Sequence, residues 1–116
     1  MRFAFAYVET IDRLQAGDPL SNIADEELAI TINGVAHDVH DRIARLNRFP
    51  YARAALEHAG QSDPPTRAKL VPDLWVRENA GEALSAEQEA IMALNSFYML
   101  ETLKAEQERR TAGKPN

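Results

Sequence analysis

Cysteine is absent from the 116 residues of this chain. Its absence excludes disulfide bonds, thiolate metal sites, iron–sulfur clusters and a cysteine nucleophile. Long apolar runs are missing as well, because the stretch from Phe3 to Val8 ends at Glu9 and is too short for a signal-peptide core or a membrane span. We therefore expect a cytoplasmic protein with no membrane partner.

Glycine is scarce, and its five residues are scattered, so no glycine-rich loop is available to bind phosphate. The four serines all lack the G-x-S-x-G setting of a hydrolase nucleophile; they are Ser21, Ser62, Ser85 and Ser96. The sequence carries no catalytic signature and indicates no cofactor. We therefore expect a protein that is not an enzyme.

Positive charge is in the minority, with 13 basic against 18 acidic side chains and a net charge of −5. This balance does not favour nucleic acid as a partner. The basic side chains are nevertheless concentrated between Arg42 and Lys69, where only Glu57 and Asp63 oppose them. Such asymmetry can orient a protein partner or a second copy of the chain.

Apolar residues, 45% of the chain, recur mainly at helical spacing and predict an all-α fold. At this size we expect a single helical domain over residues 1–110, a small bundle of four to five helices, followed by a disordered tail at residues 111–116. The expected helices cover residues 2–16, 25–47, 50–59 and 86–110. Two shorter helical turns, 66–71 and 73–76, are expected on either side of an interruption at Pro72.

The segment around Asn33-Gly34 supports two structures. This dipeptide between Ile32 and Val35 is a strong hairpin signal, which would give an α+β fold. A helix instead explains the whole segment with one period, at a cost of about 1–2 kcal/mol for placing the two residues in its interior. We expect the helix, because burying its apolar stripe outweighs that cost. The stripe consists of Leu28, Ile32, Val35, Ala36, Val39, Ile43 and Leu46.

The last helix is predicted most clearly, because Ser85 and Gln88 have the spacing of a capping box. Its middle is apolar on opposing sides, and something must therefore cover both. One explanation is a central core helix. The other is an interface with a protein partner or a second copy, formed by Met92, Met99 and Leu103, and flanked by the positive charges of Arg42, Arg45 and Arg53.

Potential metal ligands cluster only at His37, His40 and Asp41, which a helix would place on neighbouring turns. This pattern supports a metal-binding protein or a metal-dependent hydrolase as the first alternative. A DNA-binding regulator using the arginines is the second, although Pro50 stands where a helix-turn-helix has a short glycine turn. The leading hypothesis is a non-enzymatic interaction or regulatory protein that forms a homodimer.

Overall fold

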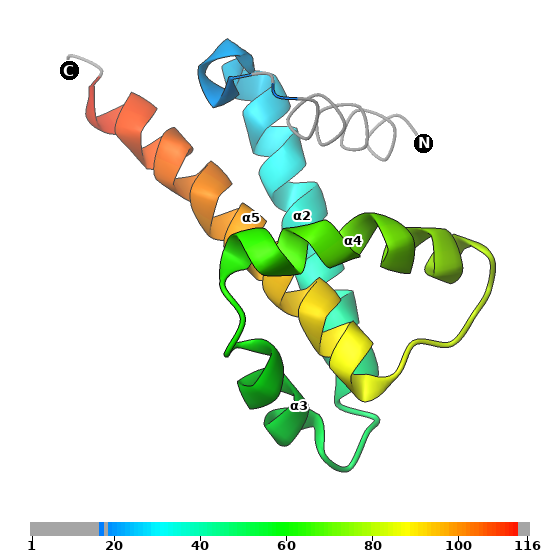
Figure 1. Cartoon of the computed structure of the whole chain (residues 1–116). Helices are drawn as coiled ribbons and strands as arrows, with labels where there is room; N and C mark the ends of the chain where they lie inside the picture. Colours follow the sequence, from blue (N-terminus) through cyan, green and yellow to red (C-terminus); the bar gives the residue numbers. More distant parts are fainter. Residues whose placement is uncertain (1–16, 18, 114–116) are drawn as a thin grey trace. The chain divides into compact units, whose positions relative to one another are not determined.

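The structure, a computed structural model, describes residue 17 and residues 19–113. These residues form helices and connecting turns with no strand (Figure 1), so the all-α prediction is confirmed and the hairpin alternative is excluded. The helix predicted over residues 2–16 lies outside the described residues, as does the end of the predicted tail. The elements are a 3-10 turn η1 (Leu20–Asn22) and the helices α2 (Asp25–Leu46), α3 (Ala52–Ala59), α4 (Pro64–Asn79) and α5 (Ala86–Ala112).

Helix α2 continues without a break through Asn33 and Gly34, as the helical period predicts. Three acidic residues occupy its first turn and Arg45 its last, an arrangement that complements the helix dipole. The fully buried Thr31 donates its hydroxyl hydrogen to the carbonyl of Glu27 at 2.7 Å. A polar side chain is thus accommodated inside the helix without an unsatisfied group.

Helix α4 contradicts one prediction, because it runs through Pro72 rather than ending there. A proline in a helix interior removes one backbone hydrogen bond and crowds the preceding turn, at a cost of about 3 kcal/mol. The helix survives because Arg67, Val71 and Leu74, spaced along one face on both sides of the proline, are all buried. Asp73, directly after the proline, lies 3.3 Å from Arg77 as an ion pair within the same helix.

Both ends of α4 are capped by recognised helix-capping structures. Asp63 is the N-cap and accepts a hydrogen bond from the backbone of Thr66, and the two prolines that follow need no amide hydrogen in the first turn. At the other end Gly81 has φ +84°, and the amide of Glu82 donates to the carbonyl of Arg77 at 3.0 Å. This is a Schellman motif, which ends the helix just before Gly81.

Helix α5 begins as predicted. The amide of Gln88 donates to Ser85 Oγ at 3.2 Å, and the amide of Ser85 donates to Gln88 Oε1 at 2.9 Å, which forms a reciprocal capping box. The helix ends at Ala112, two residues beyond the predicted Arg110. In the described part of the chain, no helix combines the length and the apolar character that a bilayer crossing needs.

The chain divides into two compact units. Among the described residues, those up to His37 and those from Met99 onward form the first unit, and Asp38–Tyr98 forms the second. In the first unit, Arg110 at the end of α5 donates to Asp25 at 2.8 Å and to the carbonyl of Leu20 at 3.1 Å. These bonds join the last turns of α5 to the start of α2.

Two apolar clusters form the core of the second unit. The first is built mainly from small side chains of α3 and α5, which allow the two helices to approach closely. Its buried members are Leu46, Ala55, Ala59, Ala86 and Ala90. The second contains Val71, Leu74 and Met92, and the partly buried Trp75 packs against it. Helix α5 therefore has apolar partners in both α3 and α4.

Candidate functional site

A network of charged side chains lies beside these clusters in the second unit, with Arg42 as its most buried member. The side chain of Arg42 is 4% exposed. Its Nε donates to Asp38 Oδ2 at 2.8 Å, and its two terminal nitrogens donate to the two oxygens of Glu78 at 2.9 and 3.1 Å. Arg42 was predicted to lie outside the apolar stripe as part of a positive flank. In the structure two carboxylates neutralise its guanidinium inside the fold.

Asp38 connects this network to α5. Its Oδ2 atom, which accepts from Arg42, also accepts a hydrogen bond from the hydroxyl of Ser96 at 2.6 Å. Ser96 therefore has a structural role that the sequence analysis missed. The available signal was a hydroxyl residue within the otherwise apolar middle of a long helix.

The pKa values within the network move in opposite directions. Burial alone would raise the pKa of Glu78, but hydrogen bonds from Arg42 and the charges of Arg42 and Arg45 outweigh it, and the pKa lies below its ordinary value. Glu89 shows the reverse. Burial raises the pKa of Glu89 above its ordinary value, although Arg45 and Arg42 act against that shift.

Glu89 and Arg45 are incompletely satisfied. Glu89 has a side chain only 8% exposed, and its carboxylate lies 3.6 Å from Arg45 Nε, beyond hydrogen-bonding distance. The buried atoms Glu89 Oε1 and Arg45 Nε have no hydrogen-bond partner in the described part of the chain. Arg45 also lies 3.9 Å from Glu78. Since buried polar atoms are normally paired, these two atoms mark an unusual position.

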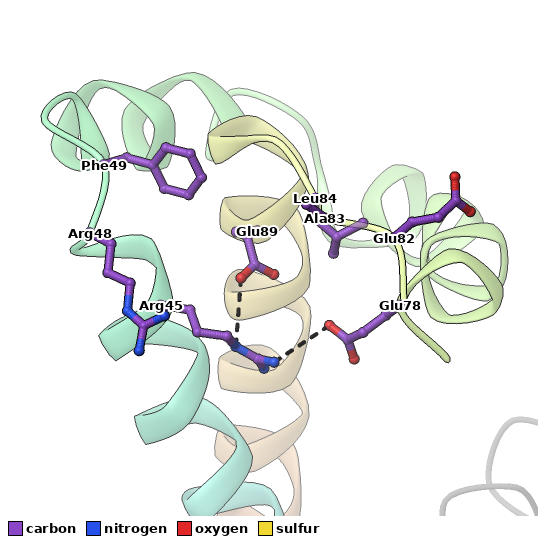
Figure 2. Close-up of a pocket in the computed structure, with 8 residues that line it drawn as sticks. All are labelled: Arg45, Arg48, Phe49, Glu78, Glu82, Ala83, Leu84 and Glu89. Carbon is purple, nitrogen blue, oxygen red and sulfur yellow. Dashed lines mark ion pairs between the residues drawn. The ribbon is translucent and has the colours of Figure 1, made fainter. Parts of the chain in front are cut away.

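The two atoms belong to residues that line a pocket of about 270 Å³. Figure 2 shows Arg45 and Arg48 extending from the end of α2, with Glu78 and Glu82 on the opposite side and Glu89 between them on α5. The guanidinium of Arg45 lies between the carboxylates of Glu89 and Glu78 and is ion-paired with both. The lining residues are Arg45, Arg48, Phe49, Glu78, Glu82, Ala83, Leu84 and Glu89.

The residues predicted as an apolar interface have differing accessibility. Met92 is 2% exposed and packs against Val71 and Leu74, and Leu103 is 1% exposed, whereas Met99 is partly buried. The large apolar side chains that remain exposed on α5 are those of Phe97 and Tyr98. They belong to the opposite side of the helix from the predicted contact face.

The predicted positive flank does not form a row of free charges. Arg42 is buried in the charged network, whereas Arg45 is 39% exposed and is ion-paired with Glu78 and Glu89. Arg53 has a side chain that is 94% exposed and lies 3.7 Å from Glu57 in the next turn of α3. Arg48, by contrast, is one of the residues that line the pocket (Figure 2).

The predicted metal ligands are all surface residues. His37, His40 and Asp41 are exposed, and His40 Nδ1 lies 3.7 Å from Asp41 Oδ1. Over residues 17 and 19–113, no group of three or more histidine, aspartate or glutamate side chains is arranged to hold a metal ion. The pocket beside Glu89, rather than this histidine cluster, is therefore the candidate site.

Comparison with protein-family models, with curated proteins and with solved structures gives no match for this chain.

Proposed function

We propose that this protein is a non-enzymatic interaction or regulatory protein that acts as a homodimer, with α5 of one copy contacting α5 of the other. The observation that carries the proposal is the exposure of two neighbouring aromatic side chains on this helix. Phe97 is 47% exposed and Tyr98 is 52% exposed. Large apolar groups gathered on the surface are typical of sites that meet a partner, and aromatic residues are enriched at such sites.

A second copy is the simplest occupant for this surface. In a two-fold dimer the same patch serves both subunits, so one exposed stripe on one helix is sufficient. Leu94 lies one turn before Phe97 and Tyr98 and is partly buried against the core. These three side chains form an apolar stripe that continues from the surface toward the interior. A partner helix placed along this stripe would cover both rings and leave the core contacts of α5 unchanged.

The test is the mass of the purified protein in solution, measured by sedimentation equilibrium over a wide concentration range. We expect a dimer whose dissociation constant increases at least tenfold in Phe97→Glu, because a charge cannot be buried without a partner. Val76→Glu is the matched control, since Val76 is 68% exposed on α4 and a change there should leave the mass unchanged. A wild-type protein that remains monomeric at all concentrations would refute the proposal.

A further inference from the structure

The pocket in the second unit offers both kinds of unsatisfied hydrogen-bonding group. When its carboxylate is ionised, Glu89 Oε1 acts only as a hydrogen-bond acceptor. Arg45 Nε acts only as a hydrogen-bond donor. Both atoms belong to residues that line the same pocket. A ligand that satisfies them must carry a donor and an acceptor a short distance apart.

The charged residues that line the pocket further restrict which ligand can bind. The guanidinium groups of Arg45 and Arg48 come from the end of α2, whereas Glu78 and Glu82 come from the end of α4 and the following loop (Figure 2). Arg42 engages both oxygens of Glu78, so Glu89 is the acid with a free buried oxygen atom. An anionic group is therefore favoured near the arginines, and a cationic donor is favoured at Glu89.

The rest of the lining is apolar and limits the ligand in size. Phe49, Ala83 and Leu84 complete the wall, and Phe49 and Leu84 are partly buried. At about 270 Å³ the pocket lies just below the usual range of about 300–1,000 Å³ for ligand sites. It therefore suits a small molecule with one apolar side.

We propose that this pocket binds a free α-amino acid with an apolar side chain, as its zwitterion. The ammonium group donates to Glu89 Oε1, the carboxylate accepts from Arg45 Nε and from the guanidinium of Arg48, and the side chain lies against Phe49 and Leu84. The inference does not depend on the homodimer, because all of these residues belong to one unit of one chain. The amino-acid site would give a small-molecule ligand to a protein that we also propose to bind a second copy of itself.

Isothermal titration calorimetry with three related probes tests the charge pattern. L-leucine carries both charges, N-acetyl-L-leucine lacks the ammonium group, and L-leucinamide lacks the carboxylate. We expect L-leucine to bind the purified protein at least tenfold more tightly than either analogue. Absence of leucine binding, or equal binding of leucine and either analogue, would overturn the proposal.

Variants of the wall residues test the location. Glu89→Gln and Arg48→Ala should each weaken leucine binding at least tenfold, whereas Arg53→Ala removes an exposed arginine of α3 outside the pocket and should have no effect. A second measurement does not require a variant. The pKa of Glu89, followed by carbon-13 NMR, should fall when leucine is added, because the ammonium group stabilises the ionised carboxylate. An unchanged pKa, or undiminished binding in Glu89→Gln, contradicts the assignment.

Discussion

Arg42 and Glu78, 36 residues apart in the sequence, are joined by two hydrogen bonds of 2.9 and 3.1 Å. This bidentate pair connects α2 to α4 within the second unit. Its geometry fixes both guanidinium and carboxylate, and Asp38 supplies a further acceptor to the same arginine at 2.8 Å. The pair is therefore a specific long-range contact between α2 and α4.

Removing Arg42 should destabilise the protein strongly. The Arg42→Ala variant leaves the carboxylates of Asp38 and Glu78 without their shared counter-charge, and losing one partner of a buried pair typically costs about 3 kcal/mol. Urea unfolding followed by circular dichroism measures the change. Arg53→Ala is the control, because its side chain is 94% exposed and its ion pair should contribute well under about 1 kcal/mol. Equal stability of the two variants would show that the buried pair is not a major contributor.

Neutralising Glu89 should stabilise the protein at neutral pH. Because burial raises the pKa of Glu89, the folded state binds a proton more tightly than the unfolded state, and wild-type stability from this group increases as the pH falls. Glu89→Gln should thus be more stable than wild type at pH 7. The difference should disappear below pH 4.5, the ordinary value, where wild type is protonated in both states.

Urea midpoints at several pH values measure this effect. Glu87→Gln provides the comparison, because Glu87 is exposed in the same first turn of α5, where its charge favours the helix dipole. This variant should gain no stability at pH 7. A Glu89→Gln variant less stable than wild type at pH 7 would show that ionised Glu89 is stabilising.

Glu106 should have the opposite pH dependence. Hydrogen bonds from Arg109 and Arg110 lower the pKa of Glu106 from 4.5 to about 2. Its stabilising contribution is present above pH 4.5 and is lost as the pH falls toward about 2. Glu106→Gln should consequently unfold at a lower urea concentration than wild type at pH 7, and the two midpoints should converge near pH 2. The exposed Glu108→Gln serves as a control, and a difference that stays constant with pH would contradict this explanation.

Replacing Pro72 should increase stability. Alanine restores the missing amide hydrogen in the middle of α4 and relieves the crowding of the preceding turn. Replacing proline also raises the conformational entropy of the unfolded state, which offsets part of this gain. We expect a net increase of about 2 kcal/mol in the free energy of unfolding. Pro65→Ala is a suitable control, since proline in the first helical turn is already compatible with the helix. A loss of stability in Pro72→Ala would indicate that the ring makes a necessary contact.

Local chemical signals account for most of what could be predicted about the fold. The long apolar period of α2 outweighed the turn signal of Asn33-Gly34, and the Ser85–Gln88 spacing located the start of α5. The predicted interruption at Pro72 is wrong because the cost of the proline is local, whereas the buried face that stabilises α4 depends on tertiary packing. A proline alone therefore does not determine where a helix ends.

The candidate site was much less accessible to prediction. Arg42 and Arg45 were singled out from the charge pattern, but their partner Glu78 comes from a segment whose helix was not fully anticipated. Burial of Glu89 likewise depends on how the helices pack. Helical spacing identifies which residues share a face, but it does not identify which charges from distant helices will meet.

The boundary between the two units falls inside helices rather than in loops. It lies between residues 37 and 38 in α2 and between residues 98 and 99 in α5, where backbone hydrogen bonds are continuous. A protease requires extended chain and should cut first in the connections at residues 60–63 and 80–85. Proteolysis at these connections therefore releases neither unit as an intact fragment. A shortened protein that ends at the boundary between the units would have α2 or α5 cut in its middle.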